Sequence, residues 1–280
     1  MSELALALAR LPLWLTVPGA LASGILLVSL AALAVRLATG IAAAAPQPAG
    51  AAALLGPLEA PVEGRRKFMF VSQLFAMLLG FLFAGEAARY FSLQESVALE
   101  ANALAALSQQ AGALPGLPAA RIRAAAGDYA RTIVEDEWPR LSRGQDSPAT
   151  ERALARLTAA VAEVVPQSPR EVQVLGVLWS RLGEAQQRRA ERLARAGGTL
   201  PNLISLVLVV ATGVALLFTA TMGSTLGVTV GGVRIVLGSL LAGVILLEVL
   251  GIVQLSHPFS GDIAIGPAPF RALGLGPPPI

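Results

Sequence analysis

The 280-residue sequence contains no cysteine and only one histidine, His257. Without cysteine the chain forms no disulfide bond, no thiolate nucleophile, no iron–sulfur cluster and no zinc site built on Cys and His. A single histidine near the C-terminus also leaves little basis for a Ser-His-Asp type of nucleophile. We therefore expect no enzymatic activity, no catalytic residue, no metal site and no cofactor.

Charged residues are scarce as well, at 14% of the chain, where a soluble domain has about a quarter. Of the 39 charged side chains, 27 fall within residues 86–195, and 14 of these are basic and 13 acidic. This near balance argues against a nucleic-acid-binding patch, despite a pI of about 10.1. The remaining chain is strongly apolar, with a mean hydropathy of +0.66 overall. That distribution predicts an integral, multi-pass membrane protein whose partner is the lipid bilayer.

Four long, strongly apolar runs are expected to cross the membrane as helices. They cover, in chain order, about residues 17–37, 68–88, 200–219 and 235–255. The second run is expected to continue as one helix to residue 110, because no proline occurs between Pro61 and Pro115. A helix over 68–110 would be about 65 Å long, while a hydrocarbon core is about 30 Å thick. Its second half therefore has to project into water.

The predicted fold is an all-α membrane protein with a helical soluble domain between the second and third spans. The first span and an Ala/Pro-rich loop cover residues 1–67, and the second span covers 68–88. The soluble domain covers 89–199, the last two spans 200–255, and the tail 256–280. Basic residues near the membrane ends are in slight excess on the side of the soluble domain, which favours a cytoplasmic location for it.

Local signals give helix ends within the soluble domain. Ser147-Pro148 and Ser168-Pro169 each combine an N-cap residue with proline at the first helical position, and Glu171 completes a capping box with Ser168. Pro139 is expected to end a helix at Trp138. The acidic run 135–137 suggests a cation site, but three consecutive helical residues point in different directions. We therefore expect a solvated face or an interface instead.

Some polar residues near the membrane allow two interpretations. Glu248 within the fourth span would cost about 2.5–3.5 kcal/mol unless it faces water or a partner. It is either a pore, cavity or proton-linked residue, or a carboxyl hydrogen-bonded to another helix. Glu86 and Arg89 lie one helical turn apart, and they are either a simple interfacial pair or part of a vestibule.

Four segments together resemble the bacterial bestrophin-like family, over about residues 68–273. They are EANALAAL (100–107), DYARTIVEDEWPRL (128–141), the arginine-rich segment before Leu-Pro at 200–201, and HPFSGDIAIGPAPFRAL (257–273). The family is more distantly related to the bestrophin anion channels. Those channels share with this chain the spacing of Gly80-Phe81, Arg89-Tyr90 and Glu95.

The resemblance implies a bestrophin-like fold in a bacterial inner membrane, a homo-oligomer of five copies, and a pore for small anions lined by the second helix. Its neck would be formed by Gln73, Met77 and Phe81, of which Gln73 departs from the apolar pattern of the family. Glu86, Arg89 and Glu95 would lie at a vestibule or interface, and Glu100 would belong to the vestibule wall.

The family's turn after the fourth span corresponds to His257, Pro258, Phe259, Gly261 and Asp262. Asp262 is the only carboxylate of that turn, whereas calcium prefers six to eight oxygen ligands, so calcium gating is not expected. We predict a passive anion channel of the chloride type. The alternative is a non-conducting scaffold or sensor whose helical domain binds a partner.

Overall fold

The computed structural model describes residues 62–196, 202–222 and 231–274, together with scattered positions between residues 7 and 30. The predicted first span and the Ala/Pro-rich loop lie largely outside these residues, as do residues 275–280 of the tail. Throughout the described part the chain is helical or turn, with no strand, in agreement with an all-α fold.

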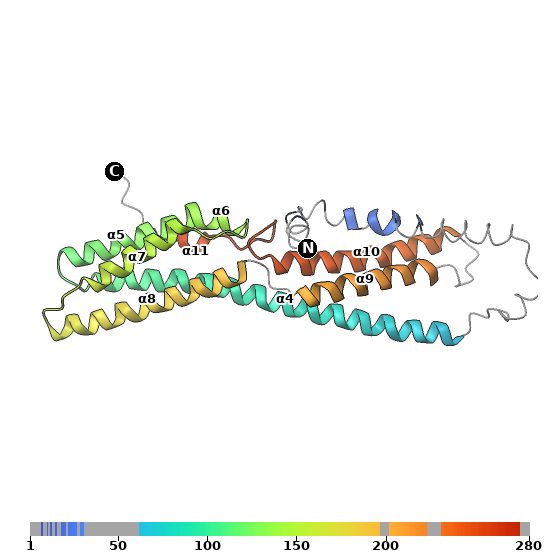
Figure 1. The fold of residues 1–280 in the computed structure, drawn as a ribbon, viewed down its shortest axis with the longest axis horizontal. Helices are drawn as coiled ribbons and strands as arrows, with labels where there is room; N and C mark the ends of the chain where they lie inside the picture. The colour runs from blue at the N-terminus through green and yellow to red at the C-terminus, as the bar shows by residue number, and fades with distance from the viewer. Residues whose placement is uncertain are drawn as a thin grey trace, which may run out of the picture. The chain divides into compact units, whose positions relative to one another are not determined.

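Eight α-helices and one π-helical segment make up the described elements (Figure 1). In chain order these are α4 (Val62–Ala111), α5 (Leu117–Thr132), η1 (Ile133–Glu137), α6 (Trp138–Leu141), α7 (Pro148–Ala162), α8 (Pro169–Ala196), α9 (Asn202–Met222), α10 (Gly231–Ser256) and α11 (Ala268–Arg271).

The long helix that the sequence predicts over 68–110 is confirmed as α4, which has 50 residues and begins directly after Pro61. Two stretches are long and apolar enough to cross a membrane among the described residues, Gln73–Ala111 and Ser239–Ser256. The apolar stretch described in α9 is shorter, Ile204–Leu216. Four crossings therefore stay a prediction.

The chain divides into two compact units. Unit 1 consists of Met1–Glu86 and Leu200–Val253, and unit 2 consists of Ala87–Thr199 and Gln254–Ile280. In unit 1, buried Leu79 of α4, Leu208 of α9 and Ile252 of α10 form a small apolar cluster. Many large apolar side chains of this unit are exposed instead, which is the pattern of helices whose outer surface meets lipid or another copy of the chain.

Unit 2 has a continuous hydrophobic core in which α4, α5, α7 and α8 take part. Helices α5 and α7 lie side by side (Figure 1). The core includes Leu104, Ile122, Leu157 and Leu178, none of which has any exposed surface. Burial of these side chains stabilises the unit by about 1.5–3 kcal/mol each.

The predicted helix starts at Ser147 and Ser168 are confirmed. The Ser147 hydroxyl accepts a hydrogen bond from the Thr150 N–H at 3.0 Å, and the Ser168 hydroxyl accepts one from the Glu171 N–H at 3.3 Å. Glu171 in turn accepts from the Gln167 N–H at 2.8 Å, one residue before the expected capping-box donor. Each cap satisfies N–H groups that the first helical turn leaves without a partner.

The prediction that Pro139 ends the helix at Trp138 is wrong. The chain passes from α5 through η1 into α6 and stays helical to Leu141. In η1 the Trp138 N–H donates to the Ile133 carbonyl, a wider turn than that of an α-helix. This turn opens the helix just ahead of Pro139, where an α-turn would press the proline ring against the carbonyl four residues earlier.

Candidate functional site

The predicted neck residues lie along one side of α4. Gln73, Met77 and Phe81 are spaced by four residues on a continuous helix, and all three are exposed. Met77 is 58% exposed and Phe81 is 65% exposed, whereas Leu79 on the opposite side is only 1% exposed. The rest of the chain therefore leaves the neck side of α4 uncovered, among the residues that the structure describes.

The predicted vestibule residues differ in exposure. Glu86 is 2% exposed, while Arg89 and Glu95 are exposed on α4. Glu248 is half-buried on α10. Glu100 has no exposed surface, so the expectation that it belongs to a vestibule wall is wrong for the chain as folded.

The turn after α10 is held by aromatic and hydroxyl groups of unit 2. Phe259 is buried and packs edge-to-face on Trp138, with 5.7 Å between ring centroids. The Trp138 indole N–H donates to the Ile265 carbonyl at 2.9 Å, and the Tyr90 hydroxyl donates to the Ile263 carbonyl at 2.6 Å. These contacts fix the turn on the helical core.

Within the same turn, His257 and Asp262 sit at its more accessible positions. His257 is half-buried, and its Nδ1 lies 3.0 Å from the Ser256 hydroxyl. Pro258 is buried, and its carbonyl accepts from the Ile265 N–H at 2.8 Å. Gly261 has φ +79°, a left-handed conformation that suits glycine. Asp262 is exposed, and no group of three or more His, Cys, Asp or Glu that could hold a metal ion occurs in the described part of the chain.

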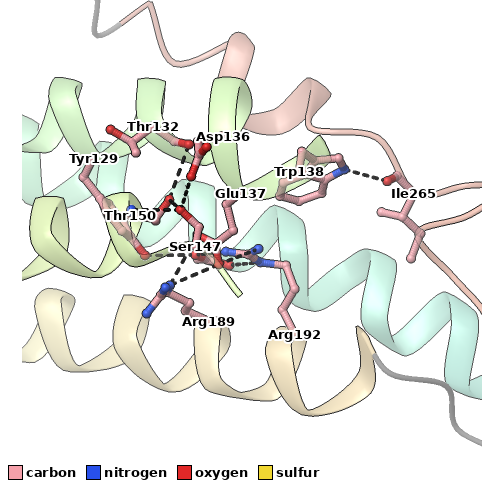
Figure 2. A network of polar contacts seen from close by, with 11 residues as sticks. Tyr129, Thr132, Asp136, Glu137, Trp138, Ser147, Thr150, Arg189, Arg192 and Ile265 are labelled. Carbon is pink, nitrogen blue, oxygen red and sulfur yellow. Dashed lines mark hydrogen bonds and ion pairs between the residues drawn. The ribbon is translucent and has the colours of Figure 1, made fainter. Parts of the chain in front are cut away.

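A cluster of buried charges in unit 2 is the most elaborate polar arrangement in the described chain (Figure 2). Arg192 of α8 binds Glu100 of α4 with two nitrogens, Nε to Oε2 at 2.8 Å and Nη2 to Oε1 at 3.0 Å. Its Nη1 donates to Glu137 of η1 at 3.3 Å, and Arg189 Nε donates to the same carboxylate at 3.2 Å. The Tyr129 hydroxyl donates to Glu100 at 3.3 Å.

The electrostatics of this cluster explain how three buried charges can lie together with the half-buried Arg189. Two arginines and two glutamates give no net charge, and the bidentate contact is a strong form of ion pair. Burial alone would lower the pKa of Arg192, but Glu100 and then Glu137 raise it well above its ordinary value. Burial, followed by the charge of Glu100, raises the pKa of the Tyr129 hydroxyl well above 10. Arg192 therefore stays charged and the Tyr129 hydroxyl stays neutral.

Aromatic rings complete the surroundings of Arg192. Its guanidinium lies 4.9 Å from the Trp138 ring centroid and 6.0 Å from that of Phe270, distances at which a cation is attracted to the ring face. Figure 2 shows Arg189 and Arg192 on neighbouring turns of one helix, both directed toward Glu137. The cluster joins α4, α5, η1 and α8 by ion pairs and hydrogen bonds. Its role is therefore to hold these four elements together.

The sequence interpretation missed this cluster, because it assigned residues 135–137 to a solvated face or an interface and did not pair Glu137 with the arginines of α8. Glu137 has no exposed surface, while neighbouring Asp136 is partly exposed and accepts from Arg140 Nε at 2.9 Å. A hydrogen bond from Ser147 and then the one from Arg140 hold the pKa of Asp136 below its ordinary value. The sequence of α8 does indicate that these arginines face the core. Arg189 and Arg192 continue the helical spacing of buried Leu178, Leu182 and Ala185, so they lie on the same side of the helix.

Comparison with known protein families gives one match. A model described as the Bestrophin-like domain matches residues 67–270, which is most of the chain. No curated protein and no solved structure matches.

Proposed function

Since the chain belongs to the bestrophin-like family, we propose that it is an oligomeric, multi-pass membrane protein that conducts small anions passively. Five copies would surround one pore, as the resemblance to bestrophin anion channels implies. The function proposed is that of a channel, without a catalytic step. The apolar stretches of α4 and α10 would hold the protein in the bilayer.

The observation that carries the proposal is the uncovered side of α4. Met77 and Phe81 are more than half exposed, although both are large and apolar. In a ring of copies this side would face the common axis. There Met77 and Phe81 would form an apolar constriction, which closes to ions when water leaves it.

Gln73 gives the constriction a polar end. Its amide can donate hydrogen bonds to an anion, and it carries no charge that would hold the anion tightly. Conduction needs binding that is weak enough for release. The neutral amide of Gln73, followed by apolar Met77 and Phe81, is compatible with such weak binding of the anion.

Liposome flux tests the proposal. Purified full-length protein is reconstituted with chloride inside the vesicles, and efflux is measured for the native chain, Met77→Ala and Phe81→Ala. Each alanine widens the constriction, so efflux should increase. Val209→Ala is the matched control, because Val209 is a 61% exposed side chain of α9 outside the proposed neck, and it should leave efflux unchanged. Absence of efflux in all four proteins contradicts a channel.

The same exposed side of α4 also suits direct contact with lipid, since Phe70 and Leu74 are exposed there too. A non-conducting scaffold or sensor with this surface would be stable in a bilayer. It would show no efflux, and the two alanine substitutions would have no effect on vesicle permeability. The liposome measurement therefore separates the two functions.

A further inference from the structure

Unit 2 contains a small cavity between α5, η1 and α11, apart from the buried charge cluster. Its volume is about 220 Å³, the space of roughly seven water molecules at about 30 Å³ each. Helix α11 packs on both α5 and η1 (Figure 1), and all three elements belong to unit 2. Sites for drug-sized molecules have about 300–1,000 Å³, so this cavity suits a smaller molecule.

The inner wall of the cavity is apolar. Gly127 and Ala130 of α5 are buried there, and their small size leaves the space open. Phe270 of α11 is also buried, and its ring is held by Trp138 with 5.7 Å between ring centroids. Val134 of η1 is half-buried beside them. This wall favours a ligand with a short hydrocarbon part, because binding would remove its apolar surface from water.

The outer edge of the cavity carries charges of both signs. Arg131 of α5, Glu135 of η1 and Arg271 of α11 are exposed there. Within the described part of the chain, neither Glu135 nor Arg271 takes part in an ion pair. Arg131 lies 3.9 Å from Asp128, but that carboxylate has a closer partner in Arg156. The charges at this edge are therefore available to a ligand.

The π-helical turn lies between two of these charges. Residues four apart on an α-helix commonly pair, but η1 begins at Ile133, between Arg131 and Glu135. These two side chains form no ion pair, although they are separated by only about 6 Å along the helix. Single π-turns within α-helices occur frequently at functional sites. Here the turn leaves a guanidinium and a carboxylate unpaired at the same cavity.

We propose that this cavity binds a small zwitterion, namely an α-amino acid with an apolar side chain such as leucine. Arg271 and Arg131 bind its carboxylate, because guanidinium groups match a carboxylate in geometry and charge. Glu135 binds its ammonium group. The apolar side chain of the ligand packs on Phe270 and Val134.

The zwitterion fits better than a ligand with one charge. An α-amino acid carries its ammonium and carboxylate groups on a single carbon atom, so one small molecule meets both signs of charge at the edge. A simple carboxylate would lie beside Glu135 and be repelled by it. A simple amine would leave the two arginines without a partner and be repelled by them.

Titration calorimetry of the full-length protein in detergent tests the site with leucine and two matched analogues. Isocaproate is leucine without its amino group, and isoamylamine is leucine without its carboxylate. Leucine should bind about tenfold or more tightly than either analogue, because each analogue lacks one charge-assisted contact. The proposal is overturned if leucine does not bind, or if it binds no better than one of the analogues.

Substitution of Arg271 tests the carboxylate end of the ligand. Arg271→Gln should weaken leucine binding by about tenfold or more. Arg170→Gln is the matched control, since Arg170 is exposed on α8 outside the cavity, and its affinity for leucine should equal that of the native chain. Both positions are exposed, so both variants should fold, which circular dichroism checks. Equal affinities in the two variants overturn the proposal.

Substitution of Glu135 tests the ammonium end and distinguishes binding from a structural role. Glu135→Gln should weaken the binding of leucine and strengthen that of isocaproate, because the negative charge that attracts the first repels the second. A purely structural role would change both affinities in the same direction. That outcome, or no change in either affinity, contradicts the assignment of Glu135.

The inference goes beyond the proposed function, because the cavity needs neither a pore nor a second copy of the chain. Leucine binding without chloride efflux supports the site and contradicts the channel. Chloride efflux from a protein that does not bind leucine supports the channel and contradicts the site.

Discussion

The two units of this protein bury their apolar side chains to different extents. In unit 2 a single cluster of 25 buried hydrophobic residues holds the helices together. Even three charged side chains, Glu100, Glu137 and Arg192, are buried there. In unit 1 the described apolar cluster has three fully buried members, and side chains such as Phe81 and Val209 are more than half exposed. Unit 2 is therefore stabilised by its own hydrophobic core, whereas the stability of unit 1 depends on what surrounds it.

Removing one member of the buried charge cluster should have the largest effect. Arg192→Leu leaves Glu100 buried without its bidentate partner and removes one of the two arginines that bind Glu137. We expect the free energy of unfolding to fall by about 3–5 kcal/mol. Chemical denaturation of the full chain, followed by circular dichroism, measures this. Arg181→Leu is the control, since its ion pair with Glu184 is on the surface and should matter by less than about 1 kcal/mol. Equal losses in the two variants would show that burial of the cluster is not what stabilises unit 2.

Apolar truncation compares the two units directly. Leu178→Ala removes a side chain with no exposed surface and should cost about 2–5 kcal/mol. Leu74→Ala removes the same atoms from a position that is 52% exposed on α4 and should cost roughly 0.5 kcal/mol or less in detergent. Thermal unfolding of both variants measures the difference. A large loss for Leu74→Ala would mean that unit 1 is more tightly packed than its exposure indicates.

One position of unit 1 is an exception to its loose packing. A Cβ at Gly24 would lie 2.7 Å from the Gly243 nitrogen and 2.8 Å from the Ser239 carbonyl oxygen. Only a small residue permits so close an approach between two helices. Gly24→Leu should therefore cost about 1–3 kcal/mol. Gly213→Leu, on open α9 surface, is the control for thermal unfolding and should be close to neutral. If both variants melt like the native chain, this helix contact is not made.

The smallest effect is expected at the N-terminal cap of α7. Ser147→Ala removes the cap of α7, at a cost of about 1 kcal/mol, and also the main cause of the lowered pKa of Asp136. Because the folded-state pKa of Asp136 is depressed, its contribution to stability is present above its ordinary pKa of 3.8 and is lost as pH falls through the folded value. The variant should titrate Asp136 closer to 3.8 by NMR, and its stability should depend less on acidic pH. An unchanged titration would assign the shift to Arg140 instead.

Local chemistry explains which elements were predictable. The proline-free stretch after Pro61 predicts one long helix, and α4 confirms it. Ser147 and Ser168 act through hydrogen bonds to residues three positions away, so their role as caps is visible in the sequence. The prediction for Pro139 also used a local rule, that proline ends a helix at the residue before it. It was wrong because a π-turn accommodates the proline.

Contacts between distant residues explain what was missed. Glu100 and Arg192 are 92 residues apart, and Glu137 resembles its exposed neighbours in any short window. Their burial follows from how α4, η1 and α8 face one another in unit 2. No pattern within a single helix specifies that arrangement, although the register of Arg189 and Arg192 on the buried side of α8 indicates that it exists.

The sequence by itself determined the helical class, the apolar stretches, the family and the helix caps, because these depend on composition, ordered motifs and interactions within a few residues. Only the tertiary structure decided that Glu100 and Glu137 are buried and paired with Arg189 and Arg192, and which sides of α4 and α8 are left uncovered. The physical reason is that burial and ion pairing depend on the packing of several helices at once. A single helix in isolation leaves all of its side chains exposed to solvent.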